Sequence, residues 1–241
     1  MRKIVVVNWK MNPQTLAEAV ELYRFTSDVC SAAKEKILTI VCPPFVYLEE
    51  LSKIESDVLL GAQDCHWEKE GAFTGEISPE MLKNLGVKYV IVGHSERRLF
   101  MGETNEMINR KIRTLLNNNL IPILAIGENY KGENLEEVLF AQLRSAFEGI
   151  DRVPSDLIVA YEPVWAVGSE EPDTPDHATD IVRFVRMMLF SNPVLYGGSV
   201  NHSNIGDFIS VPEIAGVLIG GASVDKEEFK KIIEKISGLQ L

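Results

Sequence analysis

The chain has 241 residues, of which 46% are hydrophobic and 24% are charged, which is the composition of an ordinary globular protein. It has 24 Lys and Arg residues and 35 Asp and Glu residues, which gives a net charge of −11. Because this charge repels polyanions, we expect no nucleic acid partner and no binding to a membrane surface. Cys30, Cys42 and Cys65 form no C-x-x-C pair, and no apolar run reaches the roughly 20 residues of a membrane span. We therefore expect a cytoplasmic protein with reduced thiols.

Short runs rich in Val, Ile and Leu recur along the whole chain. They predict strands over 4–7, 37–41, 59–62, 89–92, 121–125, 158–161, 194–196 and 216–219. None alternates cleanly between apolar and polar residues, which is typical of strands buried on both faces of a parallel sheet. Between them, apolar residues at helical spacing predict helices over 136–147, 176–190 and 226–236. Ser78 followed by Pro79 indicates a further helix start.

The regular alternation of strand and helix favours the α/β class and a single (β/α)8 barrel formed by residues 1–241 as one domain. No linker rich in Pro, Gly or Ser marks a domain boundary, so two smaller domains are the weaker alternative. An open doubly wound sheet is the other alternative. Its dinucleotide-binding form usually carries G-x-G-x-x-G after the first strand, whereas Asn8-Trp9-Lys10 follows that strand here.

Barrels of this type carry their catalytic groups at the C-terminal ends of strands, and two candidate catalytic residues follow predicted strands here. Pro163 disfavours helical backbone at Glu162, which holds this carboxylate at the strand tip as a general base requires. His94 precedes a predicted helix start at Ser95, where the helix dipole favours a neutral imidazole. The plain structural alternatives are an ion-paired rim carboxylate and a structural histidine.

Lys10 and Asn8 follow the first predicted strand, on either side of Trp9. We expect an extended segment with both polar side chains on one side, although lysines at such rims most often face water. The other histidines, His66, His177 and His202, lie in apparent loops without metal-ligand spacing, so we assign them no role and expect no metal site.

Glycine-rich turns follow the last two predicted strands, at 197–199 and 220–223. Loops at these positions of a barrel often bind phosphate through backbone N–H groups, and ordinary turns between strand and helix are the alternative. The stretch 163–175 is a candidate lid that excludes water, or else a plain surface excursion.

Six motifs taken together resemble the triosephosphate isomerase family, in order along the chain. They cover residues 8–12, 71–80, 93–98, 161–168, 196–199 and 218–223. The resemblance implies interconversion of dihydroxyacetone phosphate and D-glyceraldehyde 3-phosphate without a cofactor. It implies that Glu162 removes a proton next to the carbonyl, that neutral His94 polarises the carbonyl, and that Lys10, with Asn8 beside it, stabilises the enediolate.

The same resemblance implies further roles. The phosphate would be held by Gly168, Ser199, Gly220 and Gly221. Ser95 and Glu96 would support the catalytic residues, and 163–174 would be the closing lid. The resemblance also implies a homodimer in which the loop around Thr74, Gly75 and Glu76 reaches the neighbouring site.

The chain departs from the family pattern at several supporting positions. The family usually has a small, Gly-containing stretch where Glu170, Glu171 and Asp173 stand here, and we expect these acids near the phosphate to alter the lid equilibrium. Ala125 replaces a frequent cysteine, and Asp64 replaces an asparagine. Two alternative functions stay open. One is another phosphate-sugar barrel such as an epimerase, which generally needs a different acid/base pair or a metal, and the other is a catalytically impaired barrel that binds ligands or serves as a scaffold.

Overall fold

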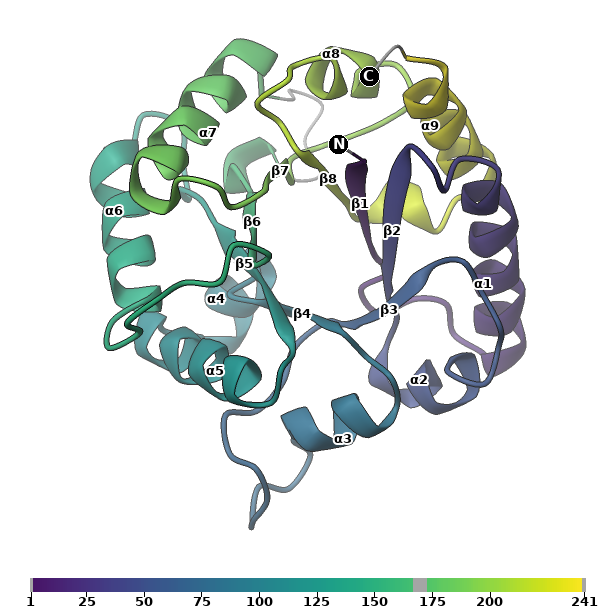
Figure 1. Cartoon of the computed structure of the whole chain (residues 1–241), viewed down its shortest axis with the longest axis horizontal. Coiled ribbons are helices and arrows are strands. Elements are labelled where there is room, and N and C mark those ends of the chain that lie inside the picture. The colour runs from purple at the N-terminus through teal and green to yellow at the C-terminus, as the bar shows by residue number, and fades with distance from the viewer. Residues whose placement is uncertain (1, 167–172, 240–241) are drawn as a thin grey trace.

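The computed structural model describes residues 2–166 and 173–239. Its strands close into a parallel barrel in chain order, with β1 pairing to both β2 and β8 (Figure 1). The strands are β1 (Lys3–Asn8), β2 (Ile37–Cys42), β3 (Leu59–Ala62), β4 (Tyr89–Val92), β5 (Ile121–Ile126), β6 (Ile158–Tyr161), β7 (Val194–Tyr196) and β8 (Gly216–Ile219). The predicted (β/α)8 barrel is confirmed, and each predicted strand lies at its expected place.

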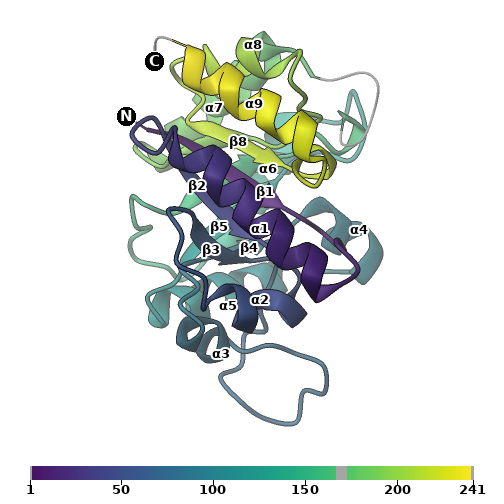
Figure 2. The ribbon, with the colours of Figure 1, turned by 90° about the vertical axis from the view of Figure 1, so that its right-hand side faces the viewer.

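Helices surround the barrel on its outer side (Figures 1 and 2). They are α1 (Leu16–Ser31), α2 (Phe45–Leu51), α3 (Pro79–Asn84), α4 (Ser95–Met101), α5 (Asn105–Asn117), α6 (Leu135–Ala146), α7 (Pro175–Leu189), α8 (Ile205–Ile209) and α9 (Lys226–Gly238). Short 3₁₀ turns occur at Val164–Ala166 and Gly221–Ser223. Within the described ranges, no helix is long and apolar enough to cross a membrane.

The predicted helix signals are confirmed, with one correction. Ser78 caps α3 by accepting a hydrogen bond from the Met81 N–H, and Pro79 occupies the first turn. His177, which we assigned to an apparent loop although it falls within the predicted 176–190 helix, lies in the first turn of α7. Thr174 caps that helix and Pro175 begins it, so the sequence did carry the signal of a helix start there.

Both faces of the strands are buried, as the near-continuous apolar runs predict. One apolar cluster fills the barrel interior and includes Val6, Ile40, Ile91 and Leu195. A larger cluster lies between the strands and the surrounding helices. This packing fixes the strand tips, and therefore fixes the residues that follow each strand.

The three cysteines are free and buried. Burial raises the pKa of the Cys30 thiol to about 11 and also raises the pKa values of Cys42 and Cys65. A thiol reacts as its thiolate, so these three side chains are protected against oxidation in the folded protein.

Candidate active site

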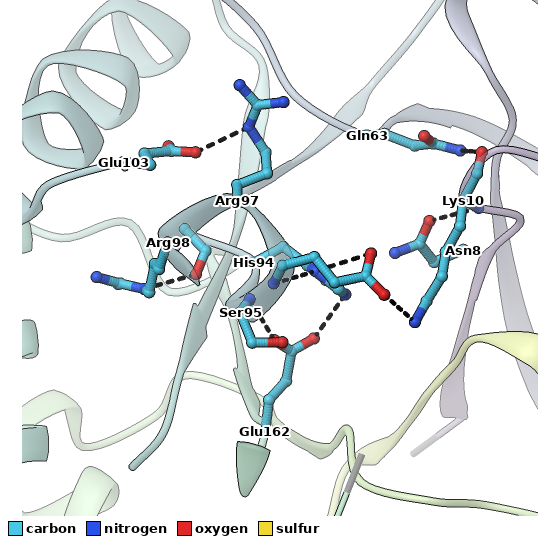
Figure 3. Close-up of polar contacts among 11 residues, drawn as sticks. Asn8, Lys10, Gln63, His94, Ser95, Arg97, Arg98, Glu103 and Glu162 are labelled. Atoms are coloured by element: carbon cyan, nitrogen blue, oxygen red, sulfur yellow. Dashed lines mark hydrogen bonds and ion pairs between the residues drawn. The ribbon is translucent and has the colours of Figure 1, made fainter. Parts of the chain in front are cut away.

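Glu162 follows β6 and points into the centre of the rim (Figure 3). Its Oε1 lies 3.2 Å from His94 Nε2, and its Oε2 accepts a hydrogen bond of 3.0 Å from the Ser95 N–H. The residue is only 2% exposed. The carboxylate is therefore removed from bulk water and held against the imidazole that follows β4, two strands away in the barrel.

His94 is the N-cap residue of α4, which positions its ring and assigns its protonation. Its Nδ1 accepts a hydrogen bond of 3.2 Å from the Glu96 N–H, so this nitrogen carries no proton. The proton of a neutral ring then sits on Nε2, which faces Glu162. Because the positive end of the α4 dipole also disfavours an imidazolium, both observations support a neutral histidine.

Lys10 reaches the site by a route that the sequence did not predict. We expected an extended segment, but the φ angle of Lys10 is 54°, in the left-handed region. Asn8 Oδ1 accepts from the Lys10 N–H at 3.0 Å, and the Gln63 amide donates to the Lys10 carbonyl at 2.8 Å. This turn directs the Lys10 ammonium to Glu96 Oε1, at 2.5 Å. The side chains of Asn8 and Gln63 thus hold an uncommon backbone conformation. No signal in the sequence pointed to this role of Gln63.

A cavity of about 360 Å³ joins these side chains to the two glycine-rich turns. Its wall contains Lys10, His94, Glu162, Gly197, Gly198, Ser199, Val200, Leu218, Gly220, Gly221 and Ala222. The predicted phosphate-binding residues Ser199, Gly220 and Gly221 therefore lie in one cavity with the predicted catalytic side chains. Gly168, the remaining one, lies outside the described residues.

Two of these glycines make room for catalytic side chains. A Cβ atom on Gly197 would lie 2.9 Å from Glu162 Cγ, and one on Gly220 would lie 3.0 Å from Lys10 Cε. Ser223 Oγ donates to the Gly220 carbonyl at 2.6 Å and steadies the second turn. The absence of side chains at these turns is thus a steric requirement, and it also leaves backbone near an incoming anion.

A buried group of two acids and two cations supports α4 from behind, and we call Asp64, Arg97, Glu103 and Lys111 the Asp64 cluster. Lys111 Nζ lies 2.7 Å from Asp64 Oδ1 and 3.0 Å from Glu103 Oε1. Arg97 lies 2.8 Å from each of the two carboxylates. Burial raises the pKa of Asp64 to about 6, although the neighbouring Lys111 and Arg97 charges lower it. The cluster ties the turn after β3 to α4 and α5.

A wider cavity of about 610 Å³ also reaches Lys10 and His94. Its lining includes Asn8, Lys10 and His94, and it opens beside Met11, which is 83% exposed. The exposed side chains of Phe100 and Met101 also line it. An apolar rim around an opening to catalytic groups is typical of a surface that another chain covers.

Asp173 lines neither cavity described above, and its carboxylate Oδ1 lies 2.8 Å from His177 Nδ1. Its effect on the lid equilibrium stays a prediction. Glu170 and Glu171 lie outside the described residues, as does half of the predicted lid at 163–174.

Comparison with known proteins agrees with this geometry. The family model described as triosephosphate isomerase matches residues 3–236. The triosephosphate isomerase of Dictyoglomus thermophilum is 41% identical over 248 aligned residues, which cover 97% of this chain and 99% of that protein. Those of Aquifex aeolicus and a Synechococcus strain are each 43% identical, and each alignment covers 97% of this chain and 99% or 97% of the relative.

Proposed function

This chain belongs to the triosephosphate isomerase family, and on that premise we propose that Glu162, His94 and Lys10 are the groups that carry out its isomerase reaction. The reaction interconverts dihydroxyacetone phosphate and D-glyceraldehyde 3-phosphate, which differ by the position of a carbonyl on neighbouring carbons. The observation that carries this assignment is the meeting of a buried carboxylate, a neutral imidazole and an ammonium in one cavity with two glycine turns.

Glu162 acts as the base that removes a proton from the carbon next to the carbonyl and returns it to the neighbouring carbon. Its Oε2 accepts a hydrogen bond from the Ser95 N–H, and its Oε1 lies 3.2 Å from His94 Nε2. These contacts hold the carboxylate in place, and substrate must take over from at least one of them. Ser95 is therefore a supporting residue that acts through the base.

Negative charge then develops on the substrate oxygens as the enediolate forms. The Nε2–H of His94 donates to this charge and moves protons between the two oxygens, while the Lys10 ammonium stabilises it electrostatically. Glu96 supports both groups, because its carboxylate pairs with Lys10 and its N–H fixes the His94 tautomer. Asn8 acts one step further away by holding the Lys10 backbone.

The phosphate group binds at the glycine turns, at Ser199, Gly220 and Gly221, with Gly168 as a further contact from the rim loop. Backbone N–H groups suit this task in a chain with a net charge of −11, because they attract an anion locally without adding charged side chains. The cavity of about 360 Å³ has room for a small phosphorylated substrate beside the catalytic side chains.

We also propose that the protein is a cytoplasmic homodimer and that each protomer forms one catalytic domain. The loop between β3 and α3, with exposed Thr74, Gly75 and Glu76, extends away from the barrel (Figure 2). The cavity of about 610 Å³ offers such a loop of a second copy a place to enter. Sedimentation equilibrium tests this, because Thr74→Glu would bring a carboxylate toward Glu96 and is expected to shift the protein toward monomer. An unchanged molecular mass would argue against this interface.

A coupled assay with D-glyceraldehyde 3-phosphate tests the function. Wild-type protein should turn the substrate over, and Glu162→Gln should lose about 10²–10⁴-fold in kcat, since the amide cannot take the proton. Circular dichroism serves as the control that the variant is folded. Absence of wild-type turnover would overturn the proposal and favour a binding or scaffold protein.

A further inference from the structure

A further cavity of about 350 Å³ shares no lining residue with the catalytic one and contains groups that the mechanism above does not use. We call it the rim-loop cavity, and Glu128, Trp165, Asp173 and His177 form the part of its wall that matters here. Glu128 follows β5, Trp165 lies just after the base Glu162, and His177 lies in the first turn of α7. The cavity therefore joins the segment after the base to the start of the next helix.

Glu128 anchors the segment that follows the base. Its backbone carbonyl accepts from the Val164 N–H at 3.0 Å. Its Oε1 accepts from Trp165 Nε1 at 2.5 Å and from the Tyr161 hydroxyl at 3.1 Å. Because Glu162 lies between Tyr161 and Val164 in the chain, these bonds fix the backbone on both sides of the base.

The anchor places two carboxylates in the same buried region. Glu128 is 3% exposed and Asp173 is 6% exposed. Burial raises the pKa of Glu128, while hydrogen bonds from Trp165 and Tyr161 and the nearby charge of His177 lower it. A buried ionised carboxylate such as that of Glu128 is stabilised by a nearby positive charge.

His177 is placed to supply that charge. Its Nδ1 lies 2.8 Å and 2.9 Å from the two Asp173 oxygens, and its ring meets Tyr161 edge-on at 6.3 Å between centroids. The other charged or titratable groups around it are Glu128, Lys131 and Glu133 from the β5–α6 segment and Asp176 from its own helix. Lys131 Nζ lies over the Trp165 ring at 5.2 Å.

We propose that His177, held in place by Asp173, is a positioning residue for the isomerase reaction, which acts through Glu128 on the segment that carries the base Glu162. With a protonated imidazole, the nearby positive charge favours the ionised form of Glu128, which keeps its bonds to Trp165 and Tyr161. With a neutral imidazole, Glu128 loses this nearby positive charge, its ionised form becomes less favourable, and the anchor weakens. This inference rests on the proposed function of Glu162.

Two substitutions separate the charge of His177 from its hydrogen bond. His177→Asn keeps a donor near the position of Nδ1 but removes the charge, and His177→Ala removes both. Imidazoles ordinarily change charge between about pH 5 and pH 8, so kcat and KM are measured at about pH 6 and about pH 8.5. We expect His177→Asn to match wild type near pH 8.5 and to fall about threefold behind in kcat near pH 6. His177→Ala should fall behind at both pH values, with KM little changed because the phosphate turns are untouched.

His202 provides a matched control, because its Nδ1 lies 3.0 Å and 2.8 Å from the Glu228 carboxylate in a pair that the mechanism does not use. His202→Asn should keep the wild-type ratio of kcat values between the two pH values. Asp173→Asn should reproduce the His177→Asn profile, and the double variant should lose no more than either single variant, since both changes break one coupling.

Each outcome decides the question. A His177→Asn profile parallel to wild type overturns the inference, and so does an additive double variant or an equal loss in His202→Asn. Asp173→Asn keeps the inference falsifiable if His177→Ala does not fold. Failure of wild-type turnover at every pH refutes the proposed function itself, whereas an active wild type with an unaltered pH ratio in the variants refutes only the role of His177.

Discussion

The catalytic cavity has two halves that are built in opposite ways. In the side-chain half, Lys10, His94, Glu96 and Glu162 contact one another through charged or polar groups from different strand ends. In the backbone half, the turns at Gly197 and Gly220 contribute main chain and little else, and Ser223 steadies the second turn from its own loop. The function of the side-chain half depends on the protonation and charge of its side chains. The function of the backbone half depends on glycines, whose lack of side-chain atoms leaves space.

This difference predicts different ways to fail. A change in the side-chain half alters charge and leaves the cavity open, so we expect the activity loss to come from weaker stabilisation of the charge that develops on the substrate. A change in the backbone half adds atoms where Glu162 Cγ or Lys10 Cε already lies, so the loss should appear through displaced catalytic groups. Four experiments test this contrast, from the largest expected effect to the smallest.

Removing the cation of the side-chain half should have the largest effect. Lys10→Met keeps the length of the side chain but removes the ammonium that faces the developing charge, so we expect kcat/KM to fall about 10²–10³-fold. The coupled isomerase assay measures this loss. Glu96→Gln, which keeps the Lys10 charge, should lose much less, and equal losses in the two variants would argue that Lys10 acts only through its partner.

Adding one methyl group to the backbone half should disturb the base. In Gly197→Ala the new Cβ would lie 2.9 Å from Glu162 Cγ and 3.1 Å from the Tyr161 carbonyl oxygen, so the carboxylate must shift. A displacement of this kind can cost about 10²-fold in kcat/KM. Gly238→Ala is the matched control, because a Cβ there meets no heavy atom within 4 Å. Equal kcat/KM in both variants would contradict the steric argument.

The Asp64 cluster, which supports the side-chain half, should make the free energy of unfolding depend on pH. Burial raises the pKa of Asp64 from 3.8 to about 6, so the folded state holds this proton more tightly than the unfolded state. Stability from this group is therefore present below about pH 4 and is lost as pH rises to about 6. Between about pH 4.5 and pH 7, wild type should lose on the order of 2 kcal/mol of unfolding free energy relative to Asp64→Asn.

Urea unfolding of both proteins at the two pH values measures this difference. Asp57→Asn is the control, because hydrogen bonds from Ser31 and Lys34 hold the pKa of the exposed Asp57 below its usual value. That variant should give a small change of the opposite sign at the acidic end. A pH-independent difference between wild type and Asp64→Asn would show that Asp64 keeps an ordinary titration.

The smallest effect concerns the backbone half alone. Inorganic phosphate at about ten times its dissociation constant should raise the melting temperature by about 3 °C, because it binds only the folded state. We expect the same rise in Glu162→Gln, since the base does not form the phosphate turns. Chloride at equal ionic strength controls for screening, and a rise that depends on Glu162 would mean that the two halves do not act separately.

The strands and most helices could be predicted because their signals are local. Buried parallel strands leave runs of Val, Ile and Leu, and caps such as Ser78 leave a residue type at a helix start. The loop assignment of His177 is wrong, because this residue lies inside the predicted helix 176–190 and the helix start is marked by Thr174 and Pro175. The Asp64 cluster left no local signal, since Asp64 and Lys111 lie on segments far apart in the chain.

The amino-acid order alone was enough for the barrel, the family resemblance and the residue types at each strand end, because these depend on short segments and on motifs in a fixed sequence. Barrel closure was needed for the contacts between those residues. It brings His94 Nε2 to Glu162, turns Lys10 toward Glu96, and pairs Asp173 with His177 away from the catalytic cavity. Such contacts join different strands and loops, so they follow from the register and packing of the whole barrel.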